Sequence, residues 1–321
     1  MESMVKQTVV VTGGAGFIGG HLVELLLKNK FKVIVIDIQK RCKSYFFLNK
    51  LDKKVVYKYV DIRNKQQVER FFKTIHPTYV IHLAAQPIVT DAYDHPYDAF
   101  ETNIMGTVNI LEACRKQLNI KGIIVASSDK AYGKTKKTYT EESPLQGDHP
   151  YDVSKSCEDL IAYTYFKTYD LPIVITRFGN VYGEGDLHFD RIVPGICQAL
   201  IKKMSLPIRS DGTFVRDYLY VKDVAKGYLL LMEQCSDKKT HVKGEAYNFS
   251  SKDNLTVLAM IQKAERSLKQ HIPYEILNIA RNEIPYQHLN DQKIRTLGWK
   301  NSVRFIDILP LVVNWYKKVL K

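Results

Sequence analysis

A glycine-rich segment, TGGAGFIGG at residues 12–20, constrains the fold of this chain more than any other feature. It follows the β-branched run TVVVT and leads into the amphipathic stretch HLVELLLKN, which is the strand–turn–helix setting of a dinucleotide-binding turn. In such a turn Gly13 permits the tight bend, Gly16 lets a pyrophosphate approach the backbone, and Gly19 lets the helix pack on the strand. The segment therefore predicts a dinucleotide site at the end of the first strand.

The same alternation of strand and helix continues through the first 180 residues. Helical patterns, such as 21–29 and 102–116, lie between short β-branched runs. This order predicts a parallel sheet covered on both faces, and right-handed crossovers make it a doubly wound α/β (Rossmann) fold. The expected strands are 8–13, 32–37, 55–61, 79–84, 122–127 and 172–177.

After Arg177 the pattern becomes irregular, with more prolines and shorter helical stretches. We therefore expect residues 1–177 to form the cofactor-binding domain, with a return segment near 213–248. Residues 178–321 are expected to form mainly a smaller substrate-binding lobe. Parallel sheets of this type bind ligands at the carboxyl ends of their strands, so this lobe should close over that edge.

The first two strands indicate which dinucleotide binds. Phe17 and Ile18 lie at the start of the first helix, whose free amides and positive dipole end suit the phosphates. Asp37 ends the second strand, about 20 residues after the turn, where an acid binds the adenosine ribose hydroxyls. A carboxylate there repels a 2′-phosphate, so we expect NAD rather than NADP, although Arg41 nearby is the residue type that a 2′-phosphate would favour.

The third and fourth strands supply further cofactor candidates. Asp61 closes the third strand beside Ile62, and its carboxylate can accept a hydrogen bond from the adenine amino group. The fourth strand ends in Leu83, Ala84 and Ala85, which are suited to form a wall against the cofactor. We interpret His82, in the same strand, as a packed histidine rather than a ligand.

Composition excludes several classes of protein. The net charge of +13 comes from lysines dispersed along the chain, which indicates a solvated surface and not a nucleic-acid groove. No apolar run approaches the roughly 20 residues of a membrane span. MESMVKQ leads directly into a strand without a signal-peptide pattern, and the five cysteines include no CxxC pair. We expect a cytoplasmic protein with reduced thiols, no metal site and no membrane or nucleic-acid partner.

The reacting groups are expected near the ends of two later elements. In YDVSK, Tyr151 and Lys155 stand four residues apart on one helical face. An ammonium group near a tyrosine lowers the pKa of the phenol, so the pair can take a hydroxyl proton while hydride leaves the same carbon for a nicotinamide. Ser128, at the end of the fifth strand, completes the set.

Together these motifs resemble the extended short-chain dehydrogenase/reductase family, nearly from end to end. RFGNVYGEGD, GTFVRDYLYVKDVAKG and LGW are similar to segments of its nucleotide-sugar enzymes. The resemblance implies that Asn180 and Arg216 contact the nucleoside diphosphate sugar, and it places Gln86 and Arg191 among the substrate-binding residues. HLAAQPIV, SSDKAYG and GNVYGEGDLHFDRIVPG are similar to the CDP-glucose 4,6-dehydratase branch, whereas the glycine turn and RDY at 216–218 depart from it.

The adjacent Asp129 and Lys130 separate two reactions on this scaffold. In the resembled family, sugar 4-epimerases usually carry small uncharged residues here, whereas 4,6-dehydratases carry an acid followed by a second proton-transfer residue. A dehydratase oxidises carbon 4, eliminates water across carbons 5 and 6, and returns hydride to carbon 6. Asp129 and Lys130 then supply the two additional groups. Lys130 serves as a base only when neutral; when charged it stabilises the enolate.

The favoured function is therefore an NAD-dependent nucleotide-sugar 4,6-dehydratase. A 4-epimerase or 4-dehydrogenase is the alternative, in which the Asp129–Lys130 pair is a structural ion pair. A non-catalytic NAD-binding regulator is a third reading, against which the intact Ser128, Tyr151 and Lys155 argue. The helices at 102–116 and 154–169 are apolar over much of their circumference, which predicts a homodimer.

Overall fold

The computed structural model describes residues 7–38, 43–135, 137–251, 253–279 and 284–320. The chain forms two compact units, each assembled from separate segments. The first comprises Met1–Gly133, Ser143–Arg177 and Ala225–Tyr247, and the second comprises Lys134–Glu142, Phe178–Val224 and Asn248–Lys321. How cofactor and substrate binding divide between these units stays a prediction.

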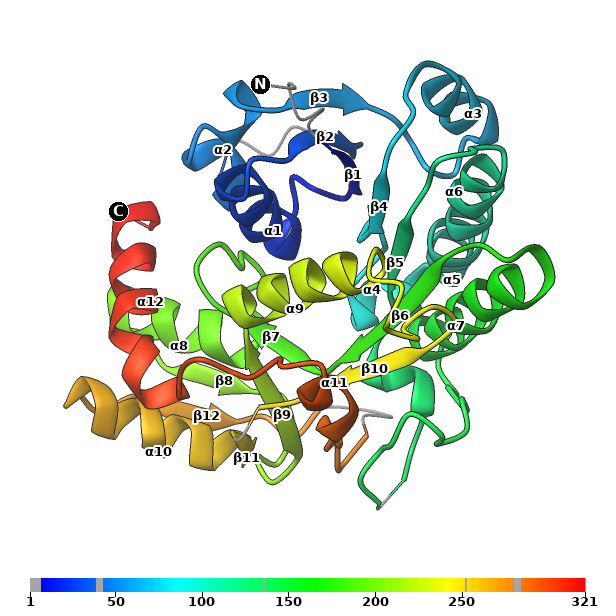
Figure 1. The fold of residues 1–321 in the computed structure, drawn as a ribbon. Helices are drawn as coiled ribbons and strands as arrows, with labels where there is room; N and C mark the ends of the chain where they lie inside the picture. Colours follow the sequence, from blue (N-terminus) through cyan, green and yellow to red (C-terminus); the bar gives the residue numbers. More distant parts are fainter. Residues whose placement is uncertain (1–6, 39–42, 136, 252, 280–283, 321) are drawn as a thin grey trace. The chain divides into compact units, whose positions relative to one another are not determined.

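The first unit is built on a seven-stranded sheet in the order β10-β6-β5-β4-β1-β2-β3 (Figure 1). Strands β1 to β6 pair in parallel throughout, which confirms the predicted doubly wound α/β fold. The strands are β1 (Thr8–Thr12), β2 (Lys32–Asp37), β3 (Val56–Tyr59), β4 (Tyr79–His82), β5 (Gly122–Ala126), β6 (Ile173–Phe178) and β10 (Ala246–Phe249).

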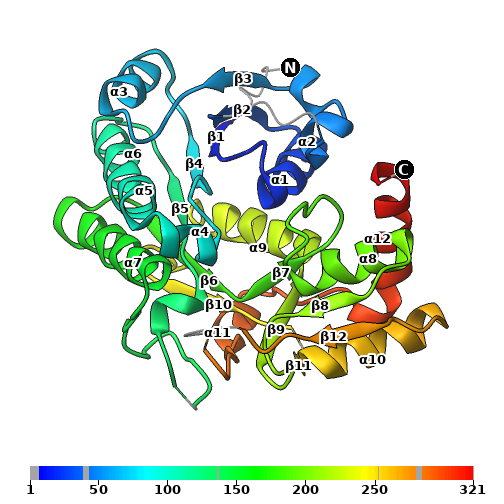
Figure 2. The same ribbon diagram turned by 180° about the vertical axis from the view of Figure 1, so that it is seen from behind.

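Helices cover both faces of this sheet. Helix α1 (Phe17–Lys28) lies on one side, and α3 (Lys65–Thr74), α6 (Gly106–Arg115) and α7 (Pro150–Tyr169) lie on the other, as the two views show (Figures 1 and 2). The strands are continuous β-branched runs because both faces are buried. Val10 is fully buried in a cluster with Leu111 and Ala162, which come from α6 and α7.

The segment between β4 and β5 departs from the predicted regular helix over 102–116. Short helices α4 (Val89–Asp94) and α5 (Pro96–Phe100) lead into a π-helical turn, η2 (Glu101–Met105), before α6 begins. The Thr107 hydroxyl donates to the Asn103 carbonyl at 2.7 Å and so competes with backbone amides for that acceptor. Such turns are frequent at functional sites.

The remaining elements of the first unit are short, apart from α9. The turn η3 (Asp129–Tyr132) follows β5, and α2 (Tyr45–Leu48) and η1 (Leu51–Lys53) follow β2. Helix α9 (Val221–Gln234) begins in the second unit and continues in the first. Helix α7 begins at Pro150, where proline suits the first helical position, so Tyr151 stands in the first turn.

The second unit contains two small sheets and four helices. β7 (Asn180–Tyr182), β9 (Val215–Tyr220) and β11 (Asn254–Thr256) form one sheet, in the order β11-β9-β7. β8 (Leu206–Ile208) and β12 (Tyr274–Ile276) form the other. Helix α12 (Phe305–Val319) packs against α8 (Ile192–Lys202) and α10 (Val257–Leu268), and α11 (Gln292–Thr296) is short. In neither unit is a described helix long and apolar enough to cross a bilayer.

Candidate functional site

The glycine turn brings the end of β4 and the first helix against the end of β1. Gly13 has φ +66°, and a Cβ added there would lie 2.8 Å from the Ala84 backbone nitrogen. A Cβ at Gly19 would lie 2.4 Å from the Gly13 carbonyl oxygen. Any larger residue at these two positions would displace backbone, so the turn keeps the open cradle that a pyrophosphate requires.

Asp37 faces this cradle from the end of β2. Its Oδ2 accepts a hydrogen bond from the Ala15 amide at 3.1 Å, and its Oδ1 accepts from the Ile38 amide at 2.8 Å. These bonds hold the buried carboxylate at the turn, where the adenosine ribose of a dinucleotide would lie. The residues present therefore fit an adenine dinucleotide, while Arg41 lies outside the described residues.

Asp61 and Ile62 lie where β3 ends, and the structure gives them local partners. Asp61 forms an ion pair with Arg63, with Oδ2 to Nη2 at 2.7 Å, and this hydrogen bond lowers the pKa of the carboxyl group. The Ile62 carbonyl accepts from the Asn109 amide group at 2.8 Å, and its side chain packs where a Cβ on Gly106 would clash. The predicted contacts of both residues with adenine stay a prediction.

His82 is a packed histidine, as predicted. Its Nδ1 lies 2.7 Å from the Thr12 hydroxyl and its Nε2 lies 3.0 Å from the Thr107 hydroxyl. Burial lowers its pKa to about 3, so the imidazole is neutral. The Thr12 hydroxyl also accepts from the amides of Leu83 and Ala84, at 3.1 and 3.0 Å. The histidine therefore fixes the start of the loop that includes the half-buried Leu83, Ala84 and Ala85.

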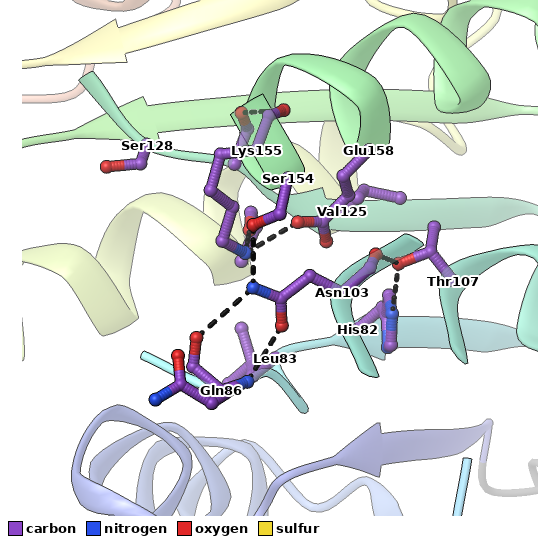
Figure 3. Close-up of polar contacts among 12 residues, drawn as sticks. His82, Leu83, Gln86, Asn103, Thr107, Val125, Ser128, Ser154, Lys155 and Glu158 are labelled. Atoms are coloured by element: carbon purple, nitrogen blue, oxygen red, sulfur yellow. Dashed lines mark hydrogen bonds and ion pairs between the residues drawn. The ribbon is translucent and has the colours of Figure 1, made fainter. Parts of the chain in front are cut away.

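Tyr151 and Lys155 lie on the buried face of α7. The tyrosine is 9% exposed and packs against Ala92 and Ala99, from α4 and α5. The Lys155 ammonium donates to the Ala126 carbonyl at the end of β5, at 2.8 Å, and to Glu158 Oε2 at 2.6 Å. The site lysine is thus fully engaged by protein groups (Figure 3).

Ser128, Asp129 and Lys130 follow β5 and form the turn η3. The Ser128 hydroxyl accepts from the Lys130 amide at 3.2 Å and donates to Asp129 Oδ1 at 3.1 Å. Asp129 is buried, the Lys130 side chain is 20% exposed, and Lys130 Nζ lies 3.4 Å from Asp129 Oδ1. The turn packs against α7, where the Ser156 hydroxyl donates to the Ala131 carbonyl at 2.8 Å. The structure thus brings the five predicted catalytic residues onto β5, η3 and α7 of one unit.

Asn103 joins the Gln86 loop to α7, a role that motif reading did not find. Its Oδ1 accepts from the Gln86 amide at 2.7 Å, and its Nδ2 donates to the Ser154 hydroxyl at 2.9 Å and to the Gln86 carbonyl at 3.2 Å (Figure 3). Asn103 is fully buried in the π-helical turn. A polar residue within an apolar helical stretch is the sequence signal that would have indicated it.

Two buried acids on α7 were also missed. Glu158 contacts Lys155, as described above. Asp152 is buried next to Tyr151, and burial raises its pKa to about 6 against the opposing effects of Lys130 and His149. Neither acid belongs to the YxxxK spacing, so only the helical periodicity, at one and seven residues after Tyr151, marks them.

The predicted sugar-nucleotide residues of the second unit occupy three different elements. Asn180 begins β7 and pairs with Tyr218 of β9. The Arg191 guanidinium caps the approach to α8 and contacts the buried Asp186 at 3.2 Å. Arg216, in β9, donates to the Val215 carbonyl and lies over the Phe214 ring, 5.4 Å from its centroid. Their contacts with a ligand stay a prediction.

The described residues hold no cluster of three or more histidine, cysteine or acidic side chains arranged for a metal ion. Their four cysteines carry free thiols: Cys114, Cys157, Cys197 and Cys235. Burial raises the pKa of Cys114 and of Cys197, so these thiols are unreactive packing groups. Cys42 lies outside the described residues.

The fold and the glycine cradle define a dinucleotide-binding α/β protein. The model of the family described as GDP-mannose 4,6 dehydratase matches residues 10–311, so the chain belongs to that family. The predicted resemblance to nucleotide-sugar epimerases and dehydratases is thereby confirmed, whereas the CDP-glucose branch stays a prediction.

Curated relatives include enzymes of both reactions. The chain is 28% identical to an Arabidopsis thaliana trifunctional UDP-glucose 4,6-dehydratase, epimerase and reductase over 98% of its length, and it spans only 48% of that relative. It is 27% identical to a Bos taurus dTDP-D-glucose 4,6-dehydratase, covering 99% of this chain and 90% of the relative. It is 32% identical to a putative UDP-glucose 4-epimerase of Methanocaldococcus jannaschii, covering 96% and 98%.

Solved structures show the same division. A Thermotoga maritima UDP-glucose 4-epimerase with UDP-glucose superposes with a TM-score of 0.88 at 28% identity, covering 98% of this chain and all of that one. A Streptomyces venezuelae dTDP-glucose 4,6-dehydratase with NAD and TYD superposes with a TM-score of 0.86 at 28% identity, covering 97% of each. The predicted cofactor, NAD, is therefore confirmed for related enzymes, and similarity alone does not separate the two reactions.

Proposed function

We propose that this chain binds NAD and a nucleoside diphosphate sugar and acts as a 4,6-dehydratase. The observation that carries the proposal is the Asp129–Lys130 pair, which the Ser128 cap holds at the end of β5. The pair packs on the helix that carries Tyr151 and Lys155. An epimerase, which only oxidises and reduces carbon 4, has no need of these two additional proton-transfer groups.

The cofactor would be held by the first unit. The cradle of Gly13, Gly16 and Gly19 takes the pyrophosphate, and Asp37 takes the adenosine ribose hydroxyls. Asp61 and Ile62 lie on the adenine side, and Leu83 to Ala85 line the nicotinamide half. When bound, NAD accepts hydride from carbon 4 of the sugar and later returns it to carbon 6.

Tyr151 takes the proton of the carbon 4 hydroxyl during oxidation. Its phenolate form is favoured by the Lys155 ammonium, which lies one helical turn away on the same face of α7. The Ser128 hydroxyl, beside Asp129 at the end of β5, is placed to bond the same sugar oxygen. Oxidation leaves a ketone at carbon 4, which acidifies the proton on carbon 5.

Asp129 and Lys130 then perform the elimination as one unit. Transfer of the ammonium proton across 3.4 Å converts the ion pair into a carboxylic acid and a free amine. The amine removes the proton from carbon 5, and the acid protonates the departing carbon 6 hydroxyl, which leaves as water. Lys130 ends as an ammonium and Asp129 as a carboxylate, so the pair returns to its starting state.

Binding of the sugar nucleotide is proposed to use both units. Gln86, tied to Asn103, would contact the sugar, and its Oε1 is buried without a hydrogen-bond partner among the described residues. Asn180, Arg191 and Arg216 would contact the diphosphate and the nucleoside. Two arginines suit these groups because guanidinium binds phosphate oxygens in bidentate fashion.

The decisive experiment incubates the protein and NAD with a panel of CDP-, UDP-, GDP- and dTDP-sugars and weighs the products. A dehydratase yields a product lighter by one water that absorbs in base, without net release of reduced cofactor. A product of unchanged mass with inverted carbon 4 would establish the epimerase instead. Tyr151→Phe in the same assay is the control for chemistry that does not come from this site.

A 4-epimerase or 4-dehydrogenase is the second candidate, because the 32% identical relative is a putative UDP-glucose 4-epimerase. In that case the ion pair between Asp129 and Lys130 has a structural role only. Neutralising the pair would then lower stability and leave the rate of sugar conversion near that of the wild type.

We also propose a homodimer formed through the outer faces of η2 and α7. Large apolar side chains are exposed there, and covering them with a second copy would remove them from water. They are Met105, Leu160, Tyr163 and Tyr169. Light scattering of Leu160→Glu against the wild type tests this proposal, and an unchanged mass of one chain in both would contradict it.

A further inference from the structure

The face of α7 that carries the site tyrosine and lysine continues into an acid. Tyr151, Lys155 and Glu158 follow one another at four and three residues, and all three are buried. The carboxylate of Glu158 is 1% exposed and lies 2.6 Å from the Lys155 ammonium. A carboxylate in direct contact with the ammonium that serves the reacting phenol changes the charge that the phenol experiences.

We propose that Glu158 is a positioning residue that keeps Lys155 protonated in its buried site and fixes the ammonium at the carboxyl end of β5. The proposal rests on the proposed function, because it assigns Lys155 the task of stabilising the phenolate of Tyr151. Glu158 itself contacts neither substrate nor cofactor in this assignment.

Burial is the reason why Lys155 needs this carboxylate. Removing an ammonium from water favours its neutral form unless an anion or several acceptors compensate. The Lys155 ammonium has the Ala126 carbonyl and Glu158 as acceptors, and the carboxylate holds the lysine pKa above its usual value despite burial. Lys155 in turn lowers the pKa of Glu158, which burial raises to about 6, so the pair is ionised at pH 7.

The groups around the pair do not substitute for Glu158. Asp159, the next residue, is occupied by Arg177 of β6, with bonds of 2.7 and 2.8 Å. His82 of β4 is neutral, because burial and the Lys155 charge both lower its pKa. The groups that face the pair from its neighbouring elements are Tyr151 and Asp159 of α7, His82 of β4, Thr107 of α6, Arg177 of β6 and Tyr228 of α9.

The pair also reaches the proposed cofactor loop. The Thr107 hydroxyl contributes a hydrogen bond to Glu158 and lies 3.0 Å from His82, which contacts Thr12. Thr12 holds the amides of Leu83 and Ala84. A change at Glu158 therefore affects the lysine first and this loop only through three intervening side chains.

The test measures the titration of Lys155 with no sugar present. Carbon-13 labelled lysine is followed by NMR between neutral and alkaline pH in the full chain, and Lys155→Met identifies the resonance. Glu158→Gln should move the midpoint of Lys155 to lower pH by about one unit or more, because an amide gives the buried ammonium no counter-charge. Glu158→Asp, one methylene shorter, should restore part of the shift.

The pH dependence of kcat/KM supplies the second readout. The alkaline limb, set by loss of the Lys155 proton, should move to lower pH in Glu158→Gln by the same amount as the NMR midpoint. Glu112→Gln is the matched control, since that acid pairs with Arg115 on α6 and leaves Lys155 untouched. It should reproduce both wild-type curves.

An unchanged Lys155 midpoint in Glu158→Gln, whatever happens to stability or rate, overturns the proposal. If that variant does not fold, Glu158→Asp decides alone, and an unmoved midpoint is again the contrary result. Failure of the proposed function would appear differently, as absent sugar conversion in the wild type while the NMR midpoint still shifts.

Discussion

Two acid–lysine pairs of the first unit, Lys155–Glu158 and Lys130–Asp129, contrast in distance and exposure. In the first, both side chains are at most 4% exposed and the charged atoms lie 2.6 Å apart. In the second, the distance is 3.4 Å and the lysine side chain is 20% exposed. The buried pair sits within a helix, whereas the open pair consists of neighbouring residues in a turn.

The difference indicates two kinds of work. A buried, short pair loses about 3–5 kcal/mol when one partner is removed, so its charges are fixed for the life of the fold. A longer, partly exposed pair is held more weakly and can exchange a proton with a substrate. We therefore assign a positioning role to Glu158 and a chemical role to Asp129 and Lys130.

The largest effect is expected from Tyr151→Phe, which removes the group that both pairs serve. Loss of a general base costs roughly 10² to 10⁴-fold in rate. Oxidation at carbon 4 should fall by that factor, while calorimetric binding of cofactor and of sugar nucleotide stays near that of the wild type. A rate within a few-fold of wild type would remove Tyr151 from the mechanism.

Neutralising the open pair should have the next largest effect. Asp129→Asn and Lys130→Met should still permit the first oxidation but slow product formation by about 10²-fold, because the elimination lacks its acid or its base. Reduced cofactor should then accumulate on the enzyme in a single turnover, visible by its absorbance.

Exchange of the carbon 5 proton with deuterium distinguishes the two residues of the open pair. Lys130→Met should slow it more than Asp129→Asn, since removal of that proton precedes loss of the hydroxyl. Lower stability in both variants, with no accumulation of reduced cofactor, would make the pair structural and favour the epimerase.

Asp37→Arg touches neither pair and sharpens the comparison as a cofactor variant. The change replaces a ribose acceptor by a phosphate partner, so NAD affinity should fall by roughly tenfold or more and NADP should be relatively favoured. Maximal rates at saturating cofactor should change little. An unchanged ratio of the two dissociation constants would show that Asp37 does not face the ribose.

Sequence reasoning predicted the sheet well, because its strands carry their own signal. Val9 to Val11 and Ile123 to Val125 are buried on both faces, so apolar continuity alone marks them. The glycine turn was predictable for a steric reason, since a Cβ at Gly19 has no room. These features depend on residues that are near one another in the chain.

The network around the site lysine was not predictable in the same way. Asn103 joins Gln86 to Ser154 across 17 and 51 residues of sequence, and the Thr107 hydroxyl reaches His82 across 25. Hydrogen bonds of this kind leave no periodic pattern. Glu158 has helical spacing, but a buried ion pair and an exposed one look alike in sequence until the neighbouring elements are placed.

The smallest effect concerns Asp152, an acid whose electrostatic neighbours include both members of the open pair. Burial raises its pKa from 3.8 to about 6, so the folded state binds the proton more tightly than the unfolded state. The stability from this group is therefore present below about pH 4 and is lost as the pH rises through about 6. Asp152→Asn should be more stable than wild type by about 2 kcal/mol at pH 8 and nearly equal to it at pH 4.

Thermal unfolding at both pH values measures that difference, with the exposed Asp94→Asn as a control that should match the wild type at each. A gap of equal size at pH 4 and pH 8 would point to packing and not to charge. Destabilisation at pH 8 would show that the folded protein stabilises the Asp152 carboxylate, most directly through Lys130. In that case Lys130 divides its charge between two acids, and the open pair becomes a triad in which the proton has a second acceptor.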